Sequence, residues 1–144
     1  MRKLSRIISI ANQKGGVGKT TTAVNVSSIL AKKGKKVMLI DCDPQGNATS
    51  GLGIEKDGEY SLYDVLINEV DIKQTLQDTC IKTLKICPAN MNLAGAEVEL
   101  VNQISREQRM KTALEEVNDE FDFIIIDCPP SLGLVTLNAF TASN

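Results

Sequence analysis

Three short apolar runs, each followed at once by a polar or glycine-rich turn, limit the folds that this chain can adopt. The runs are residues 7–11, 37–40 and 123–126. Their length and their β-branched residues are typical of strands that are buried on both faces, as in a parallel sheet. A helical pattern from residue 20 to residue 33 separates the first two runs. Strand, glycine turn, helix and strand in this order predict a parallel βαβ unit.

The rest of the 144-residue chain fits the same class. We expect a fourth strand at residues 84–87, a helix at 61–67, one or two helices between 93 and 121, and a helix at 132–142. Residues 43–58 contain four glycines and no periodicity, which predicts a long loop. The sequence therefore predicts one α/β domain over residues 1–144, a three-layer fold with a mostly parallel sheet between helices.

Composition excludes several classes of function. The chain has no histidine, so it offers neither a Ser–His or Cys–His catalytic pair nor a histidine-ligated metal. Its four cysteines show no CxxC spacing, and we expect reduced thiols. Trp is absent and the net charge is −2, which argues against a base-stacking platform or a dedicated polycation. No run approaches the ~18 apolar residues of a membrane span, so we expect a cytoplasmic protein without stable membrane insertion.

The turn after the first strand carries the strongest chemical signal. Its glycines let successive backbone N–H groups face one anion, and the helix that follows adds the positive end of its dipole. Lys19 is placed to neutralise phosphate charge, and the Thr20 hydroxyl is a hard ligand suited to Mg²⁺. The pattern departs from the usual phosphate-binding loop, because Gln13 replaces the first glycine and Lys14 adds a second lysine. The candidate nucleotide-binding residues are Lys14, Gly15, Gly16, Val17, Gly18, Lys19, Thr20 and Thr21. A glycine-rich turn with solvated lysines is the alternative.

Carboxylates follow the other two strands. Asp127 ends an apolar strand, as does a Walker-B carboxylate that holds Mg²⁺ through water. Asp41 ends the second strand, and Asp43, two residues further on, is placed to position an attacking water. The carboxyl ends of parallel strands meet at one edge of a sheet, so we expect these groups to lie together. Loop-capping aspartates are the alternative interpretation.

Four segments together resemble one family. Residues 12–22, 41–49, 88–97 and 127–133 resemble, in order along the chain, the ParA/Soj-type chromosome- and plasmid-partitioning ATPases. These belong to the deviant-Walker class of P-loop NTPases, which also contains MinD and the nitrogenase iron protein. The Asp-Pro-Gln-Gly-Asn segment at residues 43–47 points to the ParA branch.

The resemblance implies a slow Mg²⁺-dependent ATP hydrolase with ATP and Mg²⁺ as cofactors. Lys14 corresponds to the signature lysine, which reaches the partner's phosphates across an ATP-bound homodimer. Lys19, Thr20 and Thr21 correspond to the phosphate and Mg²⁺ contacts. Asp43 corresponds to the residue that orients the hydrolytic water, Asp41 lies near the metal, and Asp127 is the Walker-B carboxylate. Residues 129–133 correspond to a switch region.

The resemblance also implies partners. Family members dimerise on ATP, bind DNA without sequence preference and are stimulated by a ParB-type centromere-binding protein, so we expect a nucleoid-associated protein. They continue well beyond residue 144, so we expect the N-terminal part of one ATPase domain, with much of the DNA surface in the missing C-terminal part. The alternatives are a nucleotide-gated DNA-binding regulator and a MinD-like membrane-cycling ATPase. An iron–sulfur reductase is a weaker one.

Overall fold

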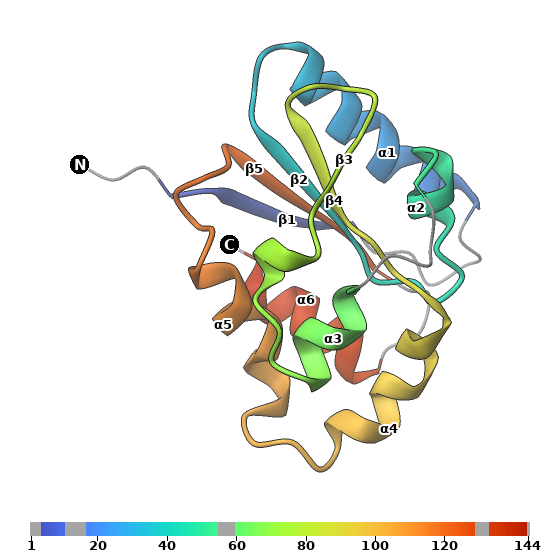
Figure 1. Ribbon diagram of the computed structural model, residues 1–144, viewed down its shortest axis with the longest axis vertical. Coiled ribbons are helices and arrows are strands. Elements are labelled where there is room, and N and C mark those ends of the chain that lie inside the picture. The colour runs from blue at the N-terminus through green and yellow to red at the C-terminus, as the bar shows by residue number, and fades with distance from the viewer. Residues whose placement is uncertain (1–3, 11–16, 55–59, 129–132, 144) are drawn as a thin grey trace.

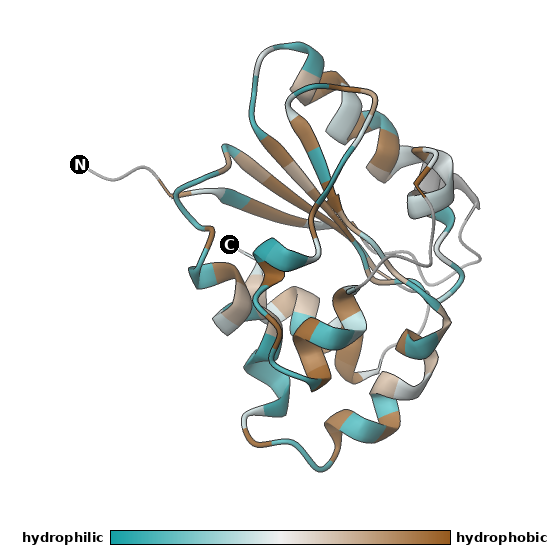
Figure 2. Ribbon diagram, viewed as in Figure 1, coloured by the Kyte–Doolittle hydropathy of each residue, from teal (hydrophilic) through white to brown (hydrophobic). Residues whose placement is uncertain are grey.

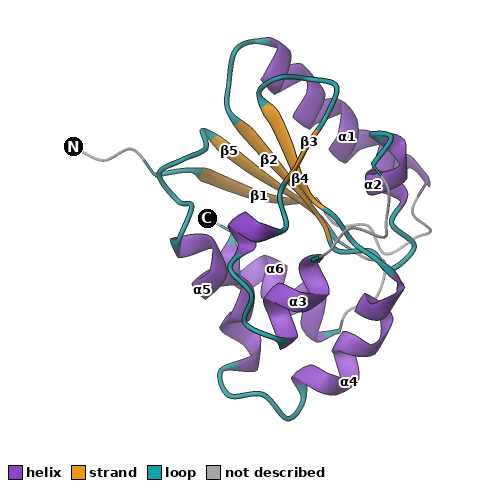
Figure 3. Ribbon diagram, viewed as in Figure 1, coloured by secondary structure: helices purple, strands orange, loops and turns teal. Residues whose placement is uncertain are grey.

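A computed structural model describes residues 4–10, 17–54, 60–128 and 133–143, with the backbone alone for residues 17–21. Five strands form one sheet in the order β1-β5-β2-β4-β3, which Figures 1 and 3 show edge to edge. The strands are β1 (Arg6–Ile10), β2 (Val37–Asp41), β3 (Gln77–Asp78), β4 (Leu84–Cys87) and β5 (Phe123–Asp127). All neighbours pair in parallel except β3, which pairs antiparallel with β4. The predicted α/β class with a mostly parallel sheet is confirmed.

Helices cover both faces of the sheet (Figure 1). One face carries α1 (Val17–Lys32) and α2 (Asn47–Gly51). The other carries α3 (Leu62–Ile67), α4 (Ala96–Leu100), α5 (Arg109–Glu115) and α6 (Leu134–Ala142). Three short 3₁₀ turns join them: η1 (Ile72–Gln74), η2 (Met91–Gly95) and η3 (Arg106–Gln108). The predicted three layers are therefore present.

The central strands are apolar along almost their whole length, as Figure 2 shows in brown. Every residue of β2 is buried, and Ile124–Ile126 of β5 are also completely buried. Helix α1 lies against its face of the sheet through small residues spaced by four, Ala23, Ser27 and Ala31. This spacing places the three on one side of the helix, and their small side chains let the helix backbone come close to the strands.

The prediction of a loop throughout residues 43–58 was wrong for residues 47–51, which form α2. Gly46 has φ 65°, a left-handed conformation that glycine adopts without steric cost. Its N–H donates to the Asp43 carbonyl at 2.8 Å, and its own carbonyl accepts from Ser50 at 2.9 Å. The glycine therefore closes a tight turn and opens a helix, whereas its place in the sequence indicated only a loop.

The region from residue 93 to residue 121 is helical in pieces. It contains α4, η3 and α5, and Ser105, with φ 56°, interrupts the helical path between α4 and η3. Strand β3 was not predicted, because two residues carry no periodic signal. Among the described residues, no helix is both long and apolar enough to cross a bilayer.

Candidate functional site

The carboxyl ends of β1, β5 and β2 bring two aspartates together. Asp127 pairs in register with Ile10 on one side and with Asp41 on the other. Neighbouring strands lie about 4.8 Å apart, so Asp41 and Asp127 are adjacent, and both are completely buried. Side chains alternate along a strand, and Leu39 and Ile125 belong to the core under α1. Both carboxylates therefore stand on the face of the sheet that α1 covers.

The sheet ladder continues one residue beyond these aspartates. The Cys42 N–H donates to the Asp127 carbonyl at 2.9 Å, and the Cys128 N–H donates to the Ile10 carbonyl at 3.0 Å. The first residue of each following loop is therefore fixed to the neighbouring strand. The two loops leave the sheet from defined positions.

Helix α1 begins at Val17 and packs on the same face of the sheet. Gly18, Lys19, Thr20 and Thr21 are among its first residues, and its first turn contains no acidic residue. Backbone N–H groups at the start of a helix lack partners within the helix and carry its positive dipole end, which favours an anion. The predicted residues Lys14, Gly15 and Gly16 lie outside the described residues.

Asp41 is held by a network of hydrogen bonds. The Thr49 hydroxyl donates to Asp41 Oδ2 at 2.7 Å, and the Thr49 N–H donates to the same oxygen at 2.9 Å. The Asp43 N–H donates to Asp41 Oδ1 at 3.1 Å. Thr49 Oγ1 in turn accepts from the Ala89 N–H at 3.2 Å. Burial raises the pKa of Asp41, and the hydrogen bonds from Thr49 and Asp43 oppose that rise.

Asp43 is positioned through the same network. Its N–H is bound to Asp41, and its Oδ1 accepts from the Gln45 N–H at 3.0 Å. Only 7% of the surface of Asp43 is exposed. The Asp43 carboxylate therefore lies in a closed turn at a fixed place next to Asp41. Sequence reasoning did not single out Thr49, and the only signal for it was its place at the end of the segment 41–49.

Replacing Thr49 by valine should destabilise the fold by about 1–3 kcal/mol, because the buried Ala89 N–H loses its acceptor and Asp41 loses a donor. The change removes a bond to the charged carboxylate and so raises the pKa of Asp41 further above its usual 3.8. When the pKa of a carboxyl group is higher in the folded than in the unfolded protein, the folded state loses stability as the pH rises toward and past the folded-state pKa. The loss should therefore be larger at pH 7 than near pH 4, measured by urea unfolding without nucleotide or divalent cations.

Thr75→Val is the matched control. Thr75 is 1% exposed and its hydroxyl donates to the Ile72 carbonyl at 2.8 Å, so its loss removes a buried hydrogen bond but no bond to a carboxylate. Its destabilisation should not change between the two pH values. A pH-independent loss in Thr49→Val as well would show that Asp41 does not depend on the Thr49 hydroxyl.

Three of the four cysteines, Cys42, Cys87 and Cys128, are buried as free thiols. Burial raises the pKa of Cys87 to about 12 and that of Cys42 well above its usual value, so both stay protonated. In the part of the chain that the structure describes, no three Cys, Asp or Glu side chains are grouped to hold a metal. Two adjacent carboxylates fit Mg²⁺, which commonly uses one or two together with phosphate oxygens and water.

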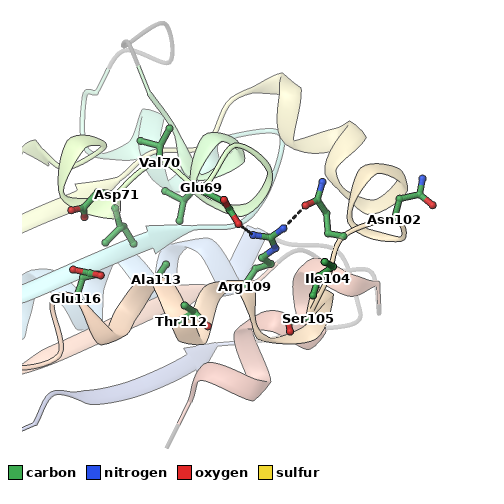
Figure 4. Close-up of a pocket in the computed structure, with 13 residues that line it drawn as sticks. Glu69, Val70, Asp71, Asn102, Ile104, Ser105, Arg109, Thr112, Ala113 and Glu116 are labelled. Atoms are coloured by element: carbon green, nitrogen blue, oxygen red, sulfur yellow. Dashed lines mark hydrogen bonds and ion pairs between the residues drawn. The ribbon is translucent and has the colours of Figure 1, made fainter.

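A cavity of about 720 Å³ lies on the other side of the sheet, between the η1 region and α5 (Figure 4). Its Arg109 donates to Glu69 at 2.6 Å and also contacts Gln103. None of its lining residues belongs to the turns after β1, β2 or β5. This cavity is therefore separate from the edge where the sequence places the site.

Comparisons with known proteins identify the family of this chain. The model of a family described as "AAA domain" matches residues 5–144. The chain is 58% identical over 142 residues to the sporulation initiation inhibitor protein Soj of Bacillus subtilis, covering 98% of this chain and 56% of that protein. It is 53% identical over 142 residues to the chromosome partitioning protein ParA of Myxococcus xanthus, covering 98% of this chain and 50% of that protein. The chain thus spans about half the length of these relatives.

A solved structure of similar fold also carries nucleotide. It is described as cobyrinic acid a,c-diamide synthase from Mycobacterium smegmatis with bound ATP analog and magnesium. It matches with a TM-score of 0.92 and 43% identity, over 97% of this chain and 57% of that one.

Proposed function

We propose a function from the premise that this chain belongs to the AAA-domain family, and within it to the ParA/Soj-type partitioning ATPases. The function is binding and slow hydrolysis of Mg·ATP at the carboxyl edge of the sheet. The observation that carries it is the register of Asp41 and Asp127, which places two buried carboxylates on the face where α1 begins. The ATP analog and magnesium in the Mycobacterium smegmatis structure support the same ligands.

The phosphates are assigned to the start of α1. Lys14 to Thr21 would surround them, with backbone N–H groups and the ammonium of Lys19 binding the β- and γ-phosphate oxygens. Mg²⁺, when bound, supplies positive charge next to those oxygens. Thr20 and Asp127 are the residues proposed to hold it. Asp41 is the third residue proposed at the metal, and hydrogen bonds from Thr49 and Asp43 hold its carboxylate in place.

The attacking water is assigned to Asp43. Its carboxylate is held in the turn that Gln45 and Gly46 close, so it can accept a hydrogen bond from water without reorganising the loop. Orienting a water in line with the γ-phosphate is the usual contribution of such a residue in phosphoryl transfer.

The finer proposals concern the whole protein. They are dimerisation on ATP, non-specific DNA binding, stimulation by a ParB-type partner and association with the nucleoid. The name of the Myxococcus xanthus relative, a chromosome partitioning protein, supports them. A DNA-binding regulator in which hydrolysis acts only as a timer is the second candidate, since one relative is called a sporulation initiation inhibitor. ATP turnover that rises with DNA and a centromere-binding partner would favour the partitioning function.

The experiment that tests this function uses full-length protein and the variant Lys14→Gln. Nucleotide titration should show preference for ATP over GTP, and light scattering should show a dimer only with ATP. Lys14→Gln should bind ATP as a monomer but lose ATP-dependent dimerisation, because two nucleotides facing each other across an interface need the partner's cation between their charges.

Two outcomes would contradict the role of Lys14. Normal dimerisation of Lys14→Gln on ATP would make Lys14 a surface lysine. Loss of ATP binding by the monomer would place it in its own chain's phosphate loop. Wild-type protein that binds no triphosphate would refute the proposed function itself.

A further inference from the structure

The start of α6 is held by a carboxylate from another helix. Glu97 of α4 accepts hydrogen bonds from the Leu134 N–H at 2.5 Å and from the Val135 N–H at 3.1 Å. These N–H groups belong to the first turn of α6, where no acceptor within the helix is available. A negative charge at this end also interacts favourably with the helix dipole. Glu97 is therefore an N-terminal cap supplied from a distant part of the chain.

The absence of a side chain at Gly133 makes room for the Glu97 carboxylate. Its φ of −88° and ψ of −168° are open to any residue, so the backbone does not require glycine. A Cβ at this position would collide with both carboxylate oxygens and the carboxyl carbon of Glu97. The approach of Glu97 to α6 thus depends on the missing side chain of residue 133.

The cap fixes one end of the chain segment that leaves Asp127. At its near end the Cys128 N–H is bound to the Ile10 carbonyl at 3.0 Å. At its far end Gly133 lies directly before the two N–H groups that Glu97 binds. Both ends of the connection from β5 to α6 are therefore tied to other elements of the fold.

The stretch that carries Glu97 also reaches the loop after β2. Residues 88–97 follow β4, and the Ala89 N–H within them donates to Thr49 Oγ1, which is bonded to Asp41. One stretch thus contacts the Asp41–Thr49 loop at its beginning and the start of α6 at its end. A shift of the Asp41–Thr49 loop would therefore move the start of α6 through this stretch, and the reverse also holds.

We propose that Glu97 is a positioning residue for the nucleotide edge. It fixes the start of α6 relative to the loop that carries Asp43. This inference rests on the proposed ATPase function, and it adds a residue that touches neither nucleotide nor metal. Glu97 lies in α4 and is not part of the start of α1, where the phosphates are proposed to bind. Replacing Glu97 should therefore lower turnover more than it lowers the affinity for nucleotide.

The test compares Glu97→Gln with Glu99→Gln in the full-length protein. Glu99 lies on the same helix and loses the same charge, but its Oε2 accepts from the Tyr63 hydroxyl at 2.7 Å. Glu97→Gln removes the negative charge and one of the two acceptor oxygens. Without nucleotide, it should raise amide hydrogen exchange at the start of α6, at Leu134 and Val135, about tenfold, as expected for a weakening of the cap by about 1.4 kcal/mol. It should lower kcat by about tenfold and change the Kd for ATP by less than about threefold. Glu99→Gln should leave all three unchanged.

Gly133→Ala tests the same contact from the other side, and it serves if Glu97→Gln fails to fold. Its Cβ should displace the carboxylate and reproduce the faster exchange and the lower kcat. In a Glu97→Ala background the same substitution should add little, because the group with which it collides is gone. Additive effects in this cycle, or a kcat unchanged while exchange at Leu134 rises, would overturn the positioning role. A wild type without ATP hydrolysis would instead refute the proposed function, and the exchange data would still show whether Glu97 caps α6.

Discussion

Lys19→Ala is expected to weaken triphosphate binding strongly in the full-length protein. Lys19 lies in the first turn of α1, on the face of the sheet that also carries Asp41 and Asp127. A charge-assisted contact to phosphate is worth on the order of 2–3 kcal/mol, so its loss should weaken ATP binding by about thirtyfold to more than a hundredfold. The measurement is a titration with a fluorescent ATP analogue in the presence of Mg²⁺.

Lys32→Ala is the matched control. It removes the same charge from the same helix, but in the last turn, where a cation interacts with the opposite end of the dipole. Its affinity for ATP should equal that of the wild type. Unchanged affinity in Lys19→Ala as well would mean that the turn before α1 is a glycine loop with solvated lysines and not a phosphate site.

Asp43→Ala should bind ATP but hydrolyse it at least about a hundredfold more slowly, which is the usual contribution of a group that positions or activates the attacking water. The phosphate loop is expected to be intact in this variant, so binding and turnover should separate. Equilibrium binding and phosphate release, measured on the same preparation, give the two quantities.

Asp43→Asn distinguishes the carboxylate from the turn that it closes. Asparagine can still accept from the Gln45 N–H, the bond that Asp43 Oδ1 accepts at 3.0 Å, but it carries no charge. Turnover should be lost in this variant too. Normal hydrolysis in Asp43→Asn with loss in Asp43→Ala would assign the effect to the shape of the turn, and wild-type turnover in both would move the role to another residue.

The buried strands could be predicted from the sequence because short, wholly apolar runs are typical of strands that are buried on both faces. Residues 37–40 and 123–126 are apolar throughout, and both form central strands of the sheet. The order of the strands could not be predicted in this way. That β5 lies between β1 and β2 depends on pairings such as Arg6 with Phe123, which no local pattern encodes.

The candidate site was likewise predictable only in part. The rule that parallel strands expose their carboxyl ends at one edge was enough to bring Asp41 and Asp127 together, and the structure places them in register. The roles of Lys14, Lys19 and Asp43 stay predictions. Thr49 and Glu97 could not be found from the sequence, because their importance comes from hydrogen bonds to Ala89 and Leu134, residues distant along the chain.

The order of strands sets the order in which the chain can fold as it leaves the ribosome. β1, α1 and β2 are made before the other described elements, but β1 and β2 do not pair, because β5 lies between them in the sheet. At a synthesis rate of about 5–20 residues per second, β5 follows β2 only after several seconds. β2 has an earlier partner in β4, whereas β1 must wait for Phe123 and the residues after it, and closing so long a loop is entropically costly. Among the described strands, β1 comes earliest in the chain and is thus one of the last to be paired.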